Sequence, residues 1–334
     1  MQIFRGFKHP GIAPACALTI GNFDGVHRGH QAMLALLNSE ARHRGVPSCV
    51  LTFEPHPRDF FAALTRKPEL APARIATLRD KLTELARCGV EQCVVLPFDV
   101  RLSSQAPEAF IDNVLMRGLG VKYVLVGDDF RFGAKRAGDY AMLDAAGSQL
   151  GFDVARMNSY EVHGVRVSSS EVRAALARGD MDGTAALLGR PYSISGHVVH
   201  GRKLGRELGF KTVNLRFSHW KPAASGIFAV RVEGLTAAGT TLPGVANLGI
   251  RPSLDPNDVN GGRVLLETHC LEWPAKLGLE GGYGKIIRVE LLHKLHDELK
   301  YDGLDALKAG IARDCDEARA YFASTRRQTT RDRI

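Results

Sequence analysis

Long apolar runs are missing from this chain of 334 residues. No stretch approaches the roughly 18 consecutive apolar residues that a membrane-spanning helix needs. The N-terminus carries Arg5 and Lys8 but lacks the apolar core of a signal peptide. The six cysteines are scattered and form no Cys-x-x-Cys pair, which argues against the common zinc and dithiol redox motifs. These absences predict a cytoplasmic protein with reduced thiols and no membrane partner.

A single long block of basic residues is also missing, although the net charge is +8. Only the C-terminal tail gathers arginines, at residues 326–333, and we expect this tail to be solvated. A basic balance suits nucleic acid, but it also suits small anionic substrates such as nucleotides and pyrophosphate. The chain has no recognised nucleic-acid-binding motif and no aromatic-rich basic patch, so small anionic molecules are the favoured partners. No feature of the sequence indicates an oligomeric state.

Residues 21–30, Gly-Asn-Phe-Asp-Gly-Val-His-Arg-Gly-His, form the most informative segment. They lie between an apolar run at residues 15–20, which predicts a buried strand, and a predicted amphipathic helix. A glycine-rich turn that enters a helix presents free N–H groups and the positive end of the helix dipole to a phosphate. His27 and His30 share one helix face and could stabilise charge that develops on phosphorus. The alternative is an ordinary helix start with one surface and one core-edge histidine.

Strand-like and helix-like stretches alternate through the first half of the chain. Apolar runs predict strands at residues 48–53, 92–97 and 123–127, and helices are expected at residues 77–87 and 107–119. This alternation predicts a doubly wound parallel sheet, whose ligands bind at the carboxyl ends of the strands.

Two polar loops follow predicted strands of this sheet. Residues 53–58 contain Pro55, and residues 127–133 contain Asp129. Their positions suit ligand binding. A rigid proline turn and a solvated acidic turn explain the same residues equally well.

Three consecutive serines at residues 168–170 precede a predicted helix at residues 171–177. Hydroxyls and N-terminal amides at such a place can hold a phosphate, and Arg173 offers a planar fork to its oxygens. A serine that caps a helix needs no ligand, so the residues alone leave both readings open.

The pattern changes in the second half of the chain, where short alternating runs stand between Gly and Pro loops. Strands are predicted at residues 192–199, 226–232, 263–270 and 285–292, which indicates a small β-barrel or sandwich. A terminal helix is expected at residues 304–322. We place the domain boundary near residue 183, which gives domains 1–182 and 183–334.

Residues 201–214 are basic and punctuated by glycine. They lack the Gly-Lys-Ser/Thr ending of a P-loop, so a Walker site is excluded. On chemistry alone a hairpin with a flexible basic tip is as good an explanation as a phosphate-binding loop.

Together these segments resemble a known family. Residues 21–30 and 168–173 look like the two signatures of nucleotidyltransferases with a His-x-Gly-His motif. Residues 201–214 resemble the riboflavin kinase loop that ends in Pro-Thr-Ala-Asn, and residues 244–252 resemble a further segment of that family. Over residues 15–322 the chain is similar to the bifunctional bacterial riboflavin kinase/FAD synthetase family. The resemblance implies a Rossmann-like nucleotidyltransferase domain followed by a riboflavin kinase-like β-barrel with a terminal helix.

For the first domain the resemblance implies FMN adenylyltransferase activity, in which FMN and ATP give FAD and pyrophosphate. His27 and His30 would be catalytic. The turn, the two polar loops and the serine segment would bind the nucleotide or the flavin through Gly21, Asn22, Phe23, Asp24, Pro55, Asp129, Ser169, Ser170 and Arg173.

For the second domain the resemblance implies a kinase that converts riboflavin to FMN with Mg-ATP. Thr212 and Asn214 match the positions of the Mg²⁺ ligands, and hard oxygen ligands suit this ion. Glu267, in the segment Leu-Glu-Thr-His, matches the catalytic base, although by itself it would be an ordinary surface residue of a strand. Gly205 lies in the loop that we expect to bind the nucleotide.

Four positions depart from the family pattern. Ser170 stands where Thr is common, which keeps the hydroxyl, and His296 stands where Arg is common. Lys211 replaces Pro and loosens the backbone, and Val213 replaces the smaller Ala. The changes at Lys211 and Val213 leave one rival hypothesis, an FAD synthetase whose kinase domain is impaired. The basic composition leaves a second, a flavin-responsive regulator that binds nucleic acid.

Overall fold

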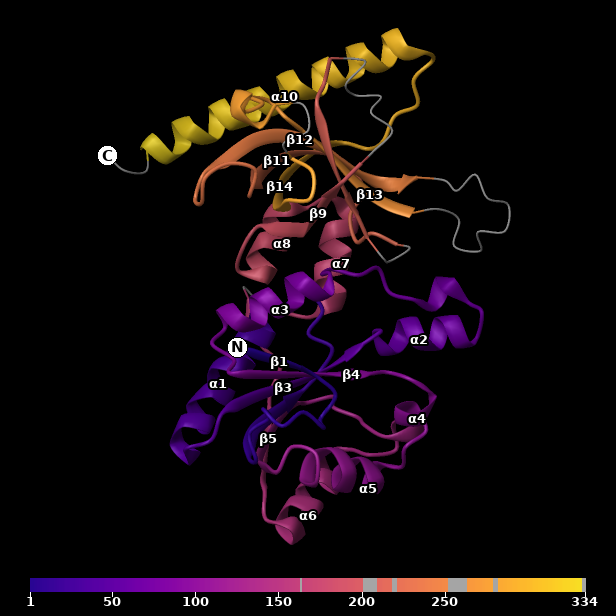
Figure 1. Cartoon of the computed structure of the whole chain (residues 1–334), viewed down its shortest axis with the longest axis vertical. Helices are drawn as coiled ribbons and strands as arrows, with labels where there is room; N and C mark the ends of the chain where they lie inside the picture. The colour runs from indigo at the N-terminus through magenta and orange to yellow at the C-terminus, as the bar shows by residue number, and fades with distance from the viewer. Residues whose placement is uncertain (163, 201–208, 218–220, 252–262, 279–281, 332–334) are drawn as a thin grey trace. The chain divides into compact units, whose positions relative to one another are not determined.

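The chain folds into two compact units, each described here by itself. The computed structural model describes residues 1–162, 164–200, 209–217, 221–251, 263–278 and 282–331 (Figure 1). The first unit contains Met1–Pro72 and Asp80–Ser168, and the second contains Ala73–Arg79 and Ser169–Ile334. Among the described residues, no helix has the length and apolarity needed to cross a membrane.

A six-stranded sheet forms the centre of the first unit, in the strand order β1-β4-β3-β2-β5-β6. All neighbouring strands are parallel. The strands are β1 (Gln2–Arg5), β2 (Cys16–Ile20), β3 (Ser48–Glu54), β4 (Gln92–Pro97), β5 (Val121–Gly127) and β6 (Asp153–Met157). Every residue of β2 is buried, as its apolar sequence predicts. The predicted parallel α/β sheet is thus confirmed.

Helices cover both faces of this sheet. Leu34, Leu37 and Leu85 pack in one apolar cluster, and Phe110 and Leu143 pack in another that uses the opposite-facing residues of β2. The helices are α1 (Arg28–Arg44), α2 (Pro57–Leu64), α3 (Leu78–Arg87), α4 (Val100–Ser103), α5 (Pro107–Phe110) and α6 (Tyr140–Leu150). This arrangement is the predicted doubly wound fold.

Shorter elements complete the first unit. The single helix predicted at residues 107–119 is divided, because a π-helical turn at Ile111–Met116 follows α5. The 3-10 turns are η1 (Pro68–Leu70) and η3 (Ala134–Arg136), and β7 (Glu161–Val162) pairs with β8 (Val165–Arg166) as a small hairpin.

The strand order reverses next to β2, which positions a ligand site. From β2 the chain proceeds through β3 and β4 on one side, and β5 then pairs with β2 on the other side. Ligands of open parallel sheets bind at such a switch point, outside the carboxyl ends of the strands. The turn at residues 21–30 leaves β2 at this place.

The second unit is built around a closed antiparallel barrel with the strand order β10-β13-β12-β11-β14-β9. Its strands are β9 (Tyr192–Val199), β10 (Thr212–Arg216), β11 (Gly226–Glu233), β12 (Thr241–Arg251), β13 (Arg263–Cys270) and β14 (Ile286–His296). The other elements are α7 (Ser169–Arg178), α8 (Met181–Leu188), η4 (Ala275–Leu277) and α10 (Leu304–Arg331). The barrel confirms one of the two architectures that the sequence left open.

The long helix α10 lies against the outside of the barrel (Figure 1). Cys315 and Ala318 from α10 pack on Ile227, Ala229 and Val245 from β11 and β12. Because neighbouring residues of a strand point to opposite faces, these strands contribute to two cores, one inside the barrel and one under α10. The terminal helix predicted from the sequence is confirmed.

A short segment from the first half of the sequence belongs to the second unit. Within Ala73–Arg79, Ile75 is 2% exposed and packs in the barrel core. Arg74 forms an isolated β-bridge with Pro222, and the Ala73 carbonyl accepts a hydrogen bond from Arg173 Nε at 2.7 Å. The chain therefore contributes to the second unit twice.

Candidate active sites

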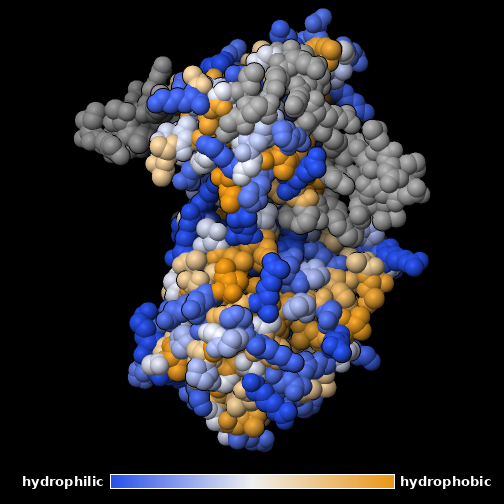
Figure 2. Space-filling view, in the orientation of Figure 1, coloured by the Kyte–Doolittle hydropathy of each residue, from blue (hydrophilic) through white to orange (hydrophobic). Residues whose placement is uncertain are grey.

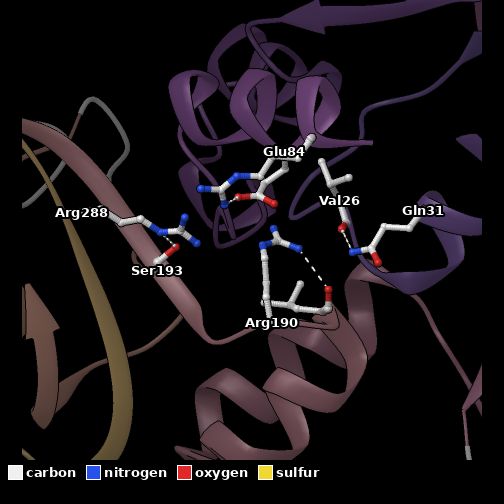
Figure 3. Close-up of polar contacts among 8 residues, drawn as sticks. Val26, Gln31, Glu84, Arg190, Ser193 and Arg288 are labelled. Atoms are coloured by element: carbon white, nitrogen blue, oxygen red, sulfur yellow. Dashed lines mark hydrogen bonds and ion pairs between the residues drawn. The ribbon is translucent and has the colours of Figure 1, made fainter. Parts of the chain in front are cut away.

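The turn after β2 adopts an unusual backbone conformation. Phe23, Gly25 and Val26 all have positive φ angles, of 49°, 88° and 41°. Such angles are costly for a bulky or β-branched residue and persist only where packing enforces them. Phe23 is 1% exposed and Val26 is fully buried, so the core holds the turn in place. Gln31 Nε2 also donates to the Val26 carbonyl at 2.9 Å (Figure 3).

The two histidines of this turn are brought together, as the spacing predicts. His27 is the N-cap of α1, and its Nδ1 accepts a hydrogen bond from the His30 N–H at 3.3 Å. The two rings stack with centroids 3.7 Å apart at 18°, and Phe23 lies 4.8 Å from His30 on a tilted plane. Because Nδ1 of His27 accepts, a neutral His27 carries its proton on Nε2 and can donate it to a ligand.

His30 is held in its neutral form. Burial lowers its pKa well below the usual value, and the charges of His27 and Lys81 lower it further. Its Nδ1 is buried, and no described residue offers it a hydrogen-bond partner. A neutral imidazole with a buried, unsatisfied nitrogen fits a group that completes its hydrogen bonds when substrate binds.

Lys81 is a residue of this region that the sequence-based reasoning missed. Its side chain is fully buried, and Nζ donates to Thr52 Oγ1 at 3.3 Å. Thr52 Oγ1 in turn donates to the carbonyl oxygen of Asn22 at 3.3 Å, inside the turn. The signal was present in the sequence, because Lys81 stands on the face of α3 that carries Leu85. A lysine ammonium thus supports the backbone of the candidate phosphate site.

The loop after β3 contains the exposed Pro55, and the phenylalanines that flank this loop form an aromatic cluster with Phe98. Ring centroids of Phe53, Phe60 and Phe61 lie 5.6, 5.5 and 5.8 Å from that of Phe98. In Figure 2 hydrophobic residues gather over α2, to which Phe60 and Phe61 belong. Phe61 is 45% exposed, so part of this cluster forms an apolar surface that a flat ring could cover.

A pocket of about 640 Å³ opens in the first unit near the ends of β1 and β4. Its volume lies in the usual range for small-molecule sites. Apolar side chains line it together with three cationic side chains, one carboxylate and other polar groups: Phe7, Leu96, Pro97, Leu102, Val114, Arg5, Lys8, Arg101, Asp99, His9 and Gln105. An apolar floor with basic groups suits an aromatic ligand that carries negative charge.

The loop after β5 holds the predicted Asp129 and its neighbour Asp128 at the surface. Asp128 accepts hydrogen bonds from Ser159 Oγ at 2.6 Å and Arg166 Nη2 at 3.2 Å. The Ser159 bond lowers the pKa of Asp128, and Arg166 lowers it further. Asp129 is exposed on the same loop. Asp128 therefore links β5 to the hairpin that follows, and Asp129 is the member of the pair left as the ligand candidate.

The serine segment lies on α7, which starts at Ser169 and so earlier than predicted. Ser169, Ser170 and Arg173 belong to the second unit, whereas His27 and His30 belong to the first. The two nucleotidyltransferase signatures therefore lie on either side of the boundary between the two units.

The second unit brings three predicted kinase residues together. Thr212 and Asn214 lie on β10, and Asn214 is paired in register with Glu267 of β13. Thr212 Oγ1 donates to Glu267 Oε1 at 3.0 Å. Asn214 is 4% exposed, and its Oδ1 is buried without a partner among the described residues. Gly205, the remaining candidate, lies outside the described residues.

The side chains of β10 alternate between the site and the barrel core. Val213 is 3% exposed and packs in the core, as Leu215 does. Thr212 and Asn214 therefore point to the other face. The extra methyl groups of Val213 fill the barrel interior and do not narrow the site.

Comparisons with known proteins identify the family that each half of the chain resembles. A family model described as FAD synthetase matches residues 10–171, and a model described as riboflavin kinase matches residues 188–322. The two models together cover most of the chain in the order that the sequence predicts.

Full-length relatives carry both activities in their names. A bifunctional riboflavin kinase/FMN adenylyltransferase of Escherichia coli K12 is 44% identical, and the match covers 98% of this chain and 99% of the relative. The protein of the same name from Haemophilus influenzae is 40% identical over 97% of this chain and 100% of its own. A solved Streptococcus pneumoniae structure titled macrolide-efflux protein has a TM-score of 0.73 and 26% identity, covering 95% of this chain and 98% of that one. The resemblance read from the motifs is confirmed, and the chain belongs to the bifunctional riboflavin kinase/FMN adenylyltransferase family.

Proposed function

We propose that this protein makes FAD in two steps, with one step assigned to each half of the sequence. The half at residues 183–334 phosphorylates riboflavin with Mg-ATP, and the half at residues 1–182 adenylylates the resulting FMN with a second ATP. The observation that carries this proposal is the match of two separate family models, together with relatives that align over nearly the whole chain. The full-length similarity favours an enzyme over the nucleic-acid-binding regulator, which only the basic composition suggested. The substrates of the enzyme are small molecules, and we propose that it acts in the cytoplasm.

In the adenylyl transfer, an oxygen of the FMN phosphate attacks the α-phosphorus of ATP in line. A new P–O bond forms, the bond from the α-phosphorus to the bridging oxygen breaks, and pyrophosphate leaves with that electron pair. His27 and neutral His30 donate hydrogen bonds to the oxygens on which charge develops. Lys81, through Thr52, holds the turn that presents N–H groups to the same phosphates.

The remaining adenylyltransferase residues would bind and orient the two substrates. The turn formed by Gly21, Asn22, Phe23 and Asp24 orients the nucleotide, and the serine segment with Ser169, Ser170 and Arg173 holds the triphosphate. The aromatic cluster at the loop of Pro55, the pocket near β1 and β4, and Asp129 on the next loop would accommodate FMN. The apolar surfaces suit the isoalloxazine ring, and the basic lining suits its phosphate.

In the kinase reaction, Thr212 and Asn214 fit a magnesium ion. The hydroxyl of Thr212 donates a hydrogen bond to Glu267, so the lone pairs of Thr212 Oγ1 remain available to a metal ion. The buried Oδ1 of Asn214 has no hydrogen-bond partner among the described residues. Both ligands are neutral oxygens, which a small hard cation accepts. Bound Mg²⁺ supplies charge neutralisation for the ATP phosphates. Glu267 accepts the proton of the ribityl hydroxyl as that oxygen attacks the γ-phosphorus and ADP leaves.

Chromatography of the flavin products tests this function. Purified protein is incubated with Mg-ATP and either riboflavin or FMN, and the products are separated over time. FAD from both substrates, with FMN as an intermediate from riboflavin, is the expected result. Conversion of FMN alone would reveal a silent kinase and favour the impaired-kinase rival, and conversion of neither substrate would reject the proposal.

A further inference from the structure

Two hydrogen bonds tie the start of β10 to its neighbour β13. His269 lies opposite Thr212 in the strand register, and its Nδ1 is 2.8 Å from the carbonyl oxygen of Lys211. Because a carbonyl oxygen can only accept, Nδ1 carries the proton and donates it. Thr212 Oγ1 donates to Glu267 two residues before His269. Residues of β13 thus hold both the carbonyl group of Lys211 and the side chain of Thr212.

The side chain of Lys211 is also held. Its Nζ lies 5.9 Å from the centroid of the Trp273 ring, within the range of a cation–π contact. Trp273 is itself fixed, because its Nε1 donates to the Gly278 carbonyl at 2.9 Å and its ring packs against the barrel core. Lys211 therefore has a defined place for its charge.

His269 has the properties of a fixed donor. The ring of Phe210 meets it edge-on, with centroids 5.4 Å apart. Burial lowers the pKa of His269, the bond to Lys211 opposes this effect, and the charge of Arg319 lowers the pKa further. The carbonyl of Lys211 fixes the tautomer of this ring, with a proton on Nδ1.

These contacts answer a question that the sequence left open. Proline at position 211 would fix φ ahead of the two proposed magnesium ligands, whereas lysine leaves φ free. We propose that His269 is a positioning residue of the kinase site, whose bond to the Lys211 carbonyl orients Thr212 and Asn214 toward Mg-ATP. The inference rests on the proposed assignment of Thr212 and Asn214. It predicts an active kinase despite the Lys211 substitution.

Three variants at one position test the role of the bond in the full-length enzyme. His269→Leu removes the donor, His269→Asn keeps an N–H at the place of Nδ1, and His269→Gln moves it to the place of Nε2. We expect His269→Leu and His269→Gln to raise the KM of the kinase for Mg-ATP about three- to tenfold, the worth of one hydrogen bond. His269→Asn should restore most of the loss, and the KM for riboflavin should change little in all three.

Matched controls separate positioning from general damage. His293→Leu changes a histidine on β14 that stacks on Tyr321 of α10, and it should leave the Mg-ATP dependence unchanged. FAD formation from FMN, measured on the same samples, reports on the first unit. Equal KM increases in the Leu and Asn variants, or a loss of kcat with unchanged KM, would overturn the positioning role.

A fourth variant distinguishes failure of this inference from failure of the proposed magnesium site. Thr212→Val removes a proposed ligand and should raise the Mg²⁺ concentration needed for half-maximal FMN formation. If Thr212→Val shifts this concentration and His269→Leu leaves the KM for Mg-ATP unchanged, the positioning role is wrong and the metal assignment stands. If neither variant has an effect, the metal assignment itself is wrong.

Discussion

The stacked histidines give the sharpest test of the adenylyltransferase site. His30→Ala removes one of two rings whose centroids are 3.7 Å apart. Loss of one preorganised donor to a developing negative charge lowers kcat by about 10²–10³, or about 2.7–4 kcal/mol. The same change also removes the ring that stacks on His27 and that contacts the ring of Phe23. The effects of His27→Ala and His30→Ala should therefore not multiply, and the double variant should lie within about tenfold of the worse single variant.

The assay follows both activities of each variant by chromatography, with FMN or riboflavin as the substrate. FMN formation from riboflavin should stay within about twofold of wild type, because sites without shared partners behave independently. The kinase candidates Thr212 and Glu267 belong to the other unit. Circular dichroism checks that the fold is intact. Equal loss of both activities, or fully multiplicative losses in the double variant, would refute the proposed roles of the pair.

Three further predictions concern other parts of the chain. Lys81→Met removes the ammonium that supports Thr52 and should slow FAD formation about tenfold, as loss of an outer support often does, with FMN formation unchanged in the chromatographic assay. Burial opposes protonation of His296, but the hydrogen bond and charge of Asp314 outweigh this effect and raise the pKa of His296. The pair therefore stabilises the folded state while His296 is protonated, and this stabilisation is lost as the pH rises through the raised pKa. Asp314→Asn should remove this pH dependence, so that a plot of Tm against pH is flatter between about pH 6 and 8. Val213→Ala empties core volume and should lower the unfolding free energy by about 1–3 kcal/mol in denaturant titrations, while the KM for Mg-ATP stays the same; a changed KM would show that Val213 faces the site.

How far the sequence predicts the fold depends on burial. The central strands of the first unit were found because both faces are covered and their residues are continuously apolar, as in β2. The edge strands β1 and β6 were missed, since each leaves most residues exposed or half-buried and so has no apolar run. In the barrel, β10 and β12 were missed for a related reason. Thr212 and Asn214 of β10 are polar residues of the candidate kinase site, and β12 contains Pro243 and two glycines.

The candidate sites were predictable where spacing alone brings residues together. His27 and His30 are neighbours on one helix turn, and Thr212 and Asn214 are alternate residues of one strand. Contacts between distant segments were not predictable, because they depend on the register of β10 with β13 and on the packing of α3 against the sheet. His269 was missed for this reason. For Lys81 the helix spacing indicated a buried face, and only its contact with Thr52 was not predictable. Only the register shows that Val213 faces the core.

The dual origin of the second unit has a consequence for dissecting the enzyme. A fragment that starts at residue 183 carries every strand of the barrel but lacks Ala73–Arg79, all of α7 and the start of α8. It therefore loses Ile75 from the barrel core and the bridge between Arg74 and Pro222, and an emptied site of this size costs about 2–5 kcal/mol. The sequence boundary at residue 183 therefore does not separate two parts of the chain that fold independently. We expect a minimal kinase to need residues 169–334 together with the seven residues Ala73–Arg79 from inside the adenylyltransferase half, supplied by fusion or in trans.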